Sequence, residues 1–177
     1  MKTLPEPIPA ITIRPLKLTD APIIKEFYAS LTPRDSWFFY PHPLDDEHAC
    51  KLAADAECPD LIALLAVEEK PDGERMDGYA YIRRPPGGEW WFGICVRPDR
   101  QEHRIGSRLL ARLMTIAHER GIERIGLHVH LDNPRGQKLY RRYGFKPVET
   151  VINRSQGVGQ YIMIAQVQSY PDPPAPV

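Results

Sequence analysis

Cysteine is scarce in this chain, and it contains no long hydrophobic run. Its 177 residues include three cysteines, Cys50, Cys58 and Cys95, which are odd in number and show no C-x-x-C spacing. We therefore expect neither a disulfide framework nor a zinc site. No apolar run approaches the length that spans a bilayer, and the N-terminal stretch lacks the apolar core of a signal peptide. These absences predict a cytoplasmic protein that does not associate with membranes.

An excess of either charge is also absent, since 23 basic residues balance 23 acidic ones. Zero net charge does not favour binding to nucleic acid. The charges are nevertheless unevenly distributed, because residues 44–60 are strongly acidic whereas residues 97–120 and 132–146 are net basic. The basic segments suit a polyanionic ligand and the acidic one a cation, although most such charges simply solvate helix faces.

The bulk composition is that of one globular domain. Hydrophobic residues make up 42% of the chain and charged residues 26%. Proline is concentrated towards both ends of the chain. We therefore expect an extended arm over residues 1–10, a single domain over residues 11–168 and a proline-rich tail over residues 169–177.

The hydrophobic periodicity alternates between strand and helix patterns in the central part of the chain. Strands are predicted at residues 11–14, 61–68, 79–83, 90–96, 124–131, 146–153 and 160–167. Helices are predicted at about residues 20–31, 45–57, 104–119 and 134–143, with an aromatic loop at residues 36–43 and turns at residues 71–73, 77–78 and 85–88. The order β-α-α-β-β-β-α-β-α-β-β predicts an α/β fold, a mixed central sheet with helices on both faces.

The segment from Trp90 to Leu110 joins an apolar strand, a polar loop and the start of a helix. Such a junction gathers unpaired backbone N–H groups at the positive end of a helix dipole, which is a site for phosphate. Basic side chains crowd the same place. This junction is common in proteins, however, and a single Gly106 often serves only helix–sheet packing. By itself the segment indicates a phosphorylated ligand only weakly.

A second segment, from Leu127 to Phe145, strengthens this indication. In it Asn133 precedes Pro134 and is predicted to cap a helix that Gly144 ends. With both segments in this order, the chain resembles the GNAT superfamily of acetyl-CoA-dependent N-acetyltransferases over about residues 11–167.

Two motifs carry the resemblance. The family's cofactor loop, V-x-P-x-x-(Q/R)-x-x-G-x-(G/A), is matched by Val96, Pro98, Gln101 and Gly106. Its second motif, N-x-x-A-x-x-L-Y-x-x-x-G-F, is matched by Asn133, Leu139, Tyr140, Gly144 and Phe145, with Gly136 for the alanine. Arg104 departs from the pattern, since it stands where the loop's first glycine is expected. If that position needs a positive φ, arginine costs about 1–2 kcal/mol; we expect it to be helical instead, where arginine costs little.

The resemblance implies a binding mode for acetyl-CoA as the acyl donor. The strands ending at Val96 and near Leu131 would separate, and the pantetheine arm would pair with the backbone of the first strand. Asn133 would lie beside the pantetheine, and Tyr140 would face the thioester sulfur. The implied cofactor-binding residues are Ile94, Cys95, Val96, Gln101, His103, Arg104, Ile105, Gly106, Ser107, Asn133 and Tyr140.

The resemblance also implies transfer of the acetyl group to a primary amine by direct attack in a ternary complex. The reaction needs an unprotonated amine, a polarised carbonyl and a proton for the departing thiolate. Tyr140 is the predicted general acid and Glu89 the predicted base, although Glu89 is one residue out of register with the glutamate of many family members. His130, His42 and water are the alternatives. Cys95 has no basic partner in the sequence and is expected to be an inert packed thiol.

The acceptor side is left open by the sequence. In the family this side is walled by the region between the first two helices, here Trp37 to His42 and the acidic helix, to which Trp90 and Trp91 would add. Aromatic walls suit a flat or sugar-like amine and carboxylates suit a cation, whereas the same aromatics would also serve to seal the core. Small-molecule and peptide amines both fit, including amino sugars, polyamines and antibiotics.

Three further readings stay open at this point. The chain would serve as a non-catalytic acyl-CoA-binding sensor or regulatory module if its base were missing. The acyl donor would be longer than acetyl if the space beside the thioester were large. A homodimer through the last two strands would be ordinary for such a fold.

Overall fold

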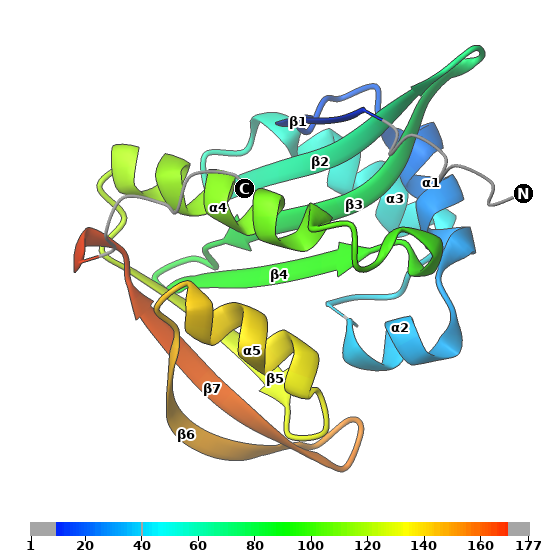
Figure 1. Cartoon of the computed structure of the whole chain (residues 1–177). Coiled ribbons are helices and arrows are strands. Elements are labelled where there is room, and N and C mark those ends of the chain that lie inside the picture. Colours follow the sequence, from blue (N-terminus) through cyan, green and yellow to red (C-terminus); the bar gives the residue numbers. More distant parts are fainter. Residues whose placement is uncertain (1–9, 40, 170–177) are drawn as a thin grey trace, which may run out of the picture.

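The computed structural model describes residues 10–39 and 41–169, and within them seven strands form one mixed sheet in the order β1-β2-β3-β4-β5-β7-β6 (Figure 1). The strands are β1 (Ile11–Pro15), β2 (Leu61–Lys70), β3 (Gly73–Arg83), β4 (Trp90–Val96), β5 (Arg124–His130), β6 (Lys146–Asn153) and β7 (Val158–Gln166). The helices are α1 (Ala21–Ser30), α2 (Pro33–Phe38), α3 (Asp46–Ala54), α4 (Ile105–Glu119) and α5 (Pro134–Arg142). Short 3-10 turns η1, η2 and η3 lie at Asp55–Glu57, Pro98–Arg100 and Val167–Ser169. The predicted fold class is confirmed.

The predicted arm and tail fall almost wholly on residues 1–9 and 170–177, which lie outside the described residues. The division into one domain with two flanking segments therefore stays a prediction. No helix of the described part is both long and apolar enough to cross a membrane.

Helix α2 is an addition to the predicted order, because residues 36–38 were predicted as part of a loop. Its start is a capping box, in which the Thr32 side chain accepts from the Asp35 backbone and Asp35 accepts from the Thr32 backbone. Pro33 occupies the first turn, where proline is well tolerated. The dense aromatic residues that follow obscured this helix signal.

Residues Asp77 and Gly78 were predicted as a turn, and this is wrong. They lie inside β3, which pairs with β2 on both sides of an irregularity between Ala66 and Val67. Ala66 pairs with Gly78 and Val67 pairs with Met76, so Asp77 is the extra residue of a β-bulge. A bulge places a residue pair with turn propensity inside a strand, which the local sequence does not reveal.

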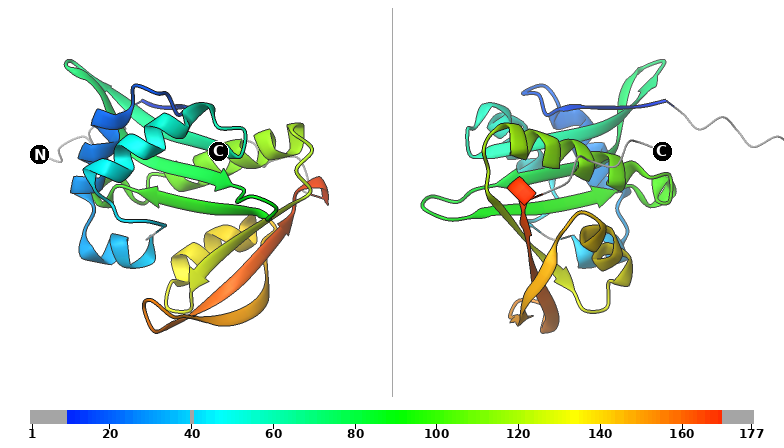
Figure 2. Two further views of the ribbon diagram at one scale, coloured as in Figure 1. Left: turned by 180° about the vertical axis from the view of Figure 1, so that it is seen from behind. Right: turned by 60° about the vertical axis from the view of Figure 1, so that its left-hand side comes forward.

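Helices cover both faces of the sheet (Figure 2). On one face α4 packs against β2, β3 and β4 through the side chains spaced by four at Ile105, Leu109 and Leu113, all buried. On the other face α1 and α3 pack over β2 and β3 through residues such as Ile24 and Phe27. Burial of each such side chain contributes about 1.5–3 kcal/mol. The two apolar layers hold the sheet rigid around the site described next.

Strands β4 and β5 run parallel but pair only where they begin. The paired positions are Trp90 with Ile125 and Trp91 with Gly126, although the strands continue to Val96 and His130. Rings from neighbouring strands cover the glycines of this region, since a Cβ on Gly93 would lie 2.5 Å from the Tyr81 ring. Because the pairing stops at Trp91, the two strands diverge beyond it, and the edge of β4 that faces β5 has no further strand partner among the described residues.

Candidate active site

A cavity of about 790 Å³ opens where β4 and β5 diverge. Its walls come from α2, the end of β4, the loop that enters α4 together with the first turn of α4, and α5. The cofactor-binding residues predicted from the sequence that line it are Ile94, Cys95, Val96, Gln101, Arg104, Ile105, Gly106, Ser107, Asn133 and Tyr140. His103 is not among them, because its exposed ring turns back to the carbonyl oxygen of Gln101. Residues far apart in the sequence thus meet at one site.

Arg104 is the N-cap of α4 and adopts a left-handed backbone, with φ 60° and ψ 9°. The expectation that this position is helical is therefore wrong. Glu102 is left-handed as well, with φ 72°. The chain leaves the turn η2 and must reverse sharply before α4 begins, so the strain falls on positions that glycine would occupy without cost.

The start of α4 presents backbone donors to the cavity. The N–H groups of Ile105, Gly106 and Ser107 precede the first intrahelical bond, which runs from the Arg108 N–H to the Arg104 carbonyl. The Arg104 side chain makes no capping hydrogen bond to them. These donors and the helix dipole suit an anion such as pyrophosphate.

Arg104→Gly is expected to raise the free energy of unfolding by about 1 kcal/mol, because glycine relieves the left-handed strain. The same change removes a cation from the cavity and should weaken acetyl-CoA binding about fivefold. Glu102→Gly is the matched control, since it relieves similar strain without removing a cation. Denaturant unfolding and calorimetric titration measure both effects, and an equal loss of affinity in the two variants would contradict the role given to Arg104.

Gly106 is not required for packing in this fold. A Cβ built on it would lie 3.6 Å or more from Ile94, Leu139 and Val96, which is ordinary contact distance. All three neighbours line the cavity, so a methyl group here would stand in the space between β4 and α5. The glycine therefore serves the cavity rather than the helix–sheet contact.

Gly106→Ala is thus expected to leave the fold as stable as wild type or slightly more stable, because alanine favours helix. Its affinity for acetyl-CoA should fall at least about tenfold, the equivalent of one 1.4 kcal/mol clash. Gly78→Ala gives the opposite pattern, since its Cβ would press on Ile105 and Leu109 at 3.0 and 3.1 Å. Unchanged affinity in Gly106→Ala would show that the donor does not approach this helix.

A buried ionic cluster supports the loop that enters α4. The fully buried Asp77 carboxylate accepts from Arg75 Nε at 2.7 Å and lies 3.4 Å from Arg100 Nε. Glu68 accepts from both arginines, and its pKa is lowered because these charges and Lys70 outweigh the effect of burial. The Asp77 carbonyl also accepts from the Arg97 N–H at 2.9 Å. The bulge at Asp77 therefore anchors this loop. The prediction from the sequence gave Asp77 no such role, because it placed the residue in a turn.

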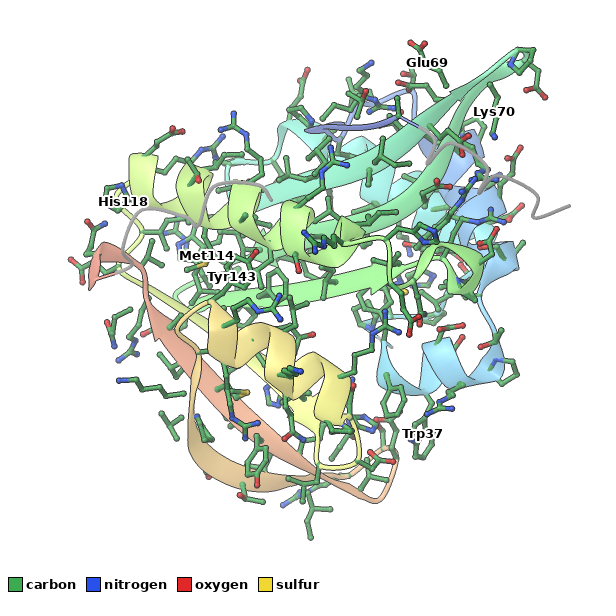
Figure 3. All side chains as sticks on the ribbon, in the orientation of Figure 1. Trp37, Glu69, Lys70, Met114, His118 and Tyr143 are labelled. Carbon is green, nitrogen blue, oxygen red and sulfur yellow. The ribbon has the colours of Figure 1, made fainter. Side chains whose placement is uncertain are left out.

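Tyr140 is buried in the wall of the cavity. Its ring meets Phe92 edge-on at 5.8 Å, and burial raises the pKa of its phenol well above the ordinary value. None of the described residues shares a hydrogen bond with its hydroxyl. The group therefore stays protonated at neutral pH and is free to donate to a ligand. The neighbouring Tyr143 donates instead to the Ser107 carbonyl at 2.8 Å and fastens α5 to α4 (Figure 3).

Asn133 and Gln101 hold the mouth of the cavity together. The Oδ1 of Asn133 accepts from the Gly136 N–H at 2.9 Å and caps α5, as the sequence predicted. Gln101 donates to Asp35 Oδ1 at 3.0 Å and to the Val96 carbonyl at 3.3 Å, and accepts from Arg135 at 2.9 Å. Its side chain therefore joins α2, β4 and α5.

The structure does not bring Glu89 to this cavity. Glu89 precedes the first residue of β4, roughly 20 Å of strand from Cys95 at ~3.3 Å per residue. Its exposed carboxylate pairs with Arg124 at 2.8 Å and lines a separate polar hollow at the other end of the strand. Its resemblance to a family glutamate rested on sequence position. Because Glu89 precedes the first residue of β4, it lies at the opposite end of the strand from the cavity.

The two alternative histidines differ in their placement. His42 stacks on His48 with ring centroids 5.1 Å apart, and burial lowers its pKa, but it does not line the cavity. His130, at the end of β5, does not line the cavity either, but it contacts Phe38 and Asp132, which both do. Its surroundings make it the stronger candidate for a base.

His128 is a second histidine of β5 that the sequence analysis did not weigh, and it does not line the cavity. It stands two residues before His130 and so shares the same face of β5. Its exposed ring stacks on Trp91 at 4.8 Å, and partial burial lowers its pKa. The alternation of two histidines along one strand was the available signal.

The aromatic residues of the expected acceptor wall separate in the structure. Phe38 and Phe39 line the cavity, whereas Trp90 and Trp91 do not. Trp37, on α2, packs on His130 beside the turn between β6 and β7 (Figure 3). Cys95 lines the cavity, and burial raises the pKa of its thiol, which agrees with an unreactive group.

The fold is that of acyltransferases that take their acyl group from a CoA thioester. The sequence profile of the Acetyltransferase (GNAT) family matches residues 24–145, well over half of the chain. The chain therefore belongs to the GNAT acetyltransferase family. This confirms the resemblance, and with it the enzyme class and acetyl-CoA as the donor used by the family.

Individual relatives share either part of the sequence or the fold. A mycothiol acetyltransferase of Clavibacter michiganensis is 33% identical over 84 residues, which make up 48% of this chain and 27% of that protein. The matched segment thus spans about a quarter of this curated relative.

Two solved structures resemble the chain in fold. Ribosomal-protein-S5-alanine acetyltransferase from Vibrio fischeri superposes with a TM-score of 0.75 at 13% identity, covering 93% of this chain and 97% of its own. PaiA N-acetyltransferase from Thermoplasma acidophilum, solved in complex with coenzyme A, gives 0.67 at 20% identity, covering 89% and 99%.

Proposed function

We propose that this chain transfers an acetyl group from acetyl-CoA to a primary amine by direct attack in a ternary complex. The observation that carries the proposal is one cavity that joins the unpaired edge of β4, the uncapped amides of α4 and the hydroxyl of Tyr140. These are the three features that a CoA thioester needs, namely an edge for pantetheine, donors for pyrophosphate and an acid for sulfur.

The donor would lie along the cavity in the order that its groups dictate. Pantetheine pairs with the backbone of Ile94 to Val96, beside Asn133. The pyrophosphate meets the first N–H groups of α4, where Arg104 adds positive charge. This placement brings the thioester sulfur to Tyr140, whose phenol protonates the departing thiolate.

The acceptor approaches from the side of α2. Phe38 and Phe39 form an apolar part of that wall, and Asp35 and Asp132 add carboxylates that attract a cationic amine. Within reach of this wall we assign His130 as the base in place of Glu89. The identity of the amine is not specified by these contacts, and the relatives named above act on different acceptors by their names.

A thiol-release assay with a panel of amines tests the proposal. Acetyl-CoA is offered with a polyamine, an amino sugar and short peptides with free N-termini, and each product is identified by mass spectrometry. The proposal expects CoA release that depends on one class of amine. A protein that binds acetyl-CoA tightly but releases no thiol with any amine would instead be a sensor.

A homodimer through the last strands also stays a proposal. Strand β6 lies at the edge of the sheet and exposes Val148 and Ile152, which are 62% and 72% accessible. Light scattering at micromolar concentration tests it.

A further inference from the structure

The imidazole of His130 is almost completely buried at the end of β5, with 3% of its surface exposed. The rings of Trp37 and Phe38 meet it edge-on, with centroids 5.7 and 5.4 Å away. Its Nε2 lies 3.1 Å from Gln156 Oε1 in the turn between β6 and β7. Its Nδ1 is buried and has no hydrogen-bond partner among the described residues. Such an atom is costly and calls for an explanation.

The orientation of Gln156 follows from the backbone groups around it. The Ser155 N–H donates to Asn153 Oδ1 at 3.0 Å, so Asn153 Nδ2 points to Gln156 Oε1, 2.9 Å away. On its other side Gln156 Nε2 donates to the Trp37 carbonyl at 2.9 Å. A backbone N–H only donates and a carbonyl only accepts, so each of the two amides has one allowed orientation.

This orientation decides which nitrogen of His130 carries the proton. Gln156 Oε1 only accepts, so the Nε2 that faces it must carry a hydrogen. In the neutral ring the lone pair is therefore on Nδ1. The Oδ1 of Asp132 is 3.7 Å from Nδ1, so a proton that arrives there meets a carboxylate.

We propose that Gln156 is a positioning residue that holds His130 in the Nε2–H tautomer, so that Nδ1 accepts the proton of the acceptor amine. The inference rests on the proposed acetyl transfer. Phe38 and Asp132 contact His130 and also line the cavity, so Nδ1 lies directly behind its acceptor wall. The Asp132 side chain is 68% exposed, so solvent reaches its carboxylate, and a water molecule bound there would relay the proton to Nδ1.

The protons balance in this scheme. The amine nitrogen forms a bond to the thioester carbonyl carbon, and the bond from that carbon to sulfur breaks. The amine proton goes to His130 Nδ1, and the Tyr140 hydroxyl proton goes to the departing sulfur. Transfer through solvent from His130 to the Tyr140 phenolate restores both groups. An amine that arrives as an ammonium ion first releases one proton to solvent.

The tautomer is measured by nitrogen NMR of the full-length protein with ¹⁵N-labelled histidine, free of ligands. The wild-type spectrum should show His130 with hydrogen on Nε2. Gln156→Leu removes the acceptor and should abolish this preference, whereas Gln156→Glu keeps an oxygen opposite Nε2 and should retain it. A wild-type ring with hydrogen on Nδ1 would overturn the inference without reference to catalysis.

The second measurement is the rate of acetyl transfer in a single turnover. His130→Gln should lower the rate at least about 10²-fold, as loss of a general base does. Gln156→Leu should also lower the rate, with unchanged affinity for acetyl-CoA. Gln156→Glu should keep most of the wild-type rate. The matched control is His128→Gln, the same substitution on the same face of β5, which should leave the rate near wild type.

The outcomes separate the two proposals. Failure of every variant, wild type included, to acetylate any amine would remove the proposed function while the spectrum still reports the tautomer. A normal rate in His130→Gln, or a loss confined to His128→Gln, would overturn this inference while acetyl transfer stands.

Discussion

Tyr140→Phe is expected to lower kcat for acetyl transfer by about 10²- to 10⁴-fold, the range for loss of a general acid. The affinity for acetyl-CoA should not change, because the phenol acts only when the carbon–sulfur bond breaks. The ring keeps its edge-on contact with Phe92, so the fold has no reason to weaken. Steady-state kinetics and calorimetric titration of acetyl-CoA measure the two quantities.

Tyr143→Phe is the control for this change. It removes a hydroxyl at the end of the same helix, one that fastens α5 to the Ser107 carbonyl and does not face the cavity. We expect a loss of about 1 kcal/mol in the free energy of unfolding and a normal kcat. Equal kcat in the Tyr140 variant and wild type would end the assignment of Tyr140 as the acid.

Asp77→Ala is expected to lower the free energy of unfolding by about 1.5–3 kcal/mol, since it removes a fully buried charged hydrogen-bond partner and leaves Glu68 as the carboxylate that Arg75 and Arg100 share. Asp77 is fully buried and binds Arg75, and it also lies 3.4 Å from Arg100 in the loop that leads to α4. Affinity for acetyl-CoA should fall as well, because Arg100 lines the cavity. Urea unfolding gives the stability, with affinity measured well below the unfolding midpoint.

The control for Asp77 is Asp99→Ala. Asp99 pairs with Arg97 at 3.0 Å on the same loop, but its side chain is 55% exposed. Exposed pairs contribute about 0–1 kcal/mol, so this variant should be nearly as stable as wild type. Similar small losses in both variants would mean that the buried cluster does not anchor the loop.

Strongly patterned segments could be predicted from the sequence. The strands at residues 90–96 and 146–153 were predicted with the bounds that the structure gives them, because turn residues bound each segment. Helix α4 was predicted to within one residue from its apolar stripe. The motif spacings also led to residues that line one cavity, His103 excepted, and their role in binding a cofactor stays a prediction.

The remaining features depend on tertiary structure. Whether Arg104 is left-handed is decided by how the loop approaches α4, and whether Asp77 sits in a turn is decided by pairing with β2. Glu89 carries the right chemistry but lies at the wrong end of its strand. The hydrogen-bond partner of His130 comes from a turn 26 residues away in sequence, and no local sequence pattern predicts this contact.

Thermal unfolding with and without acetyl-CoA tests the central claim, that the cavity beside the end of β4 binds the donor. At 100 times its Kd, acetyl-CoA should stabilise the protein by about 2.7 kcal/mol. For a chain of this size that raises Tm by roughly 5 °C or more. Free CoA should give a similar shift and ATP none. No shift at millimolar acetyl-CoA would contradict the account, because a cavity that does not hold the donor cannot support the transfer.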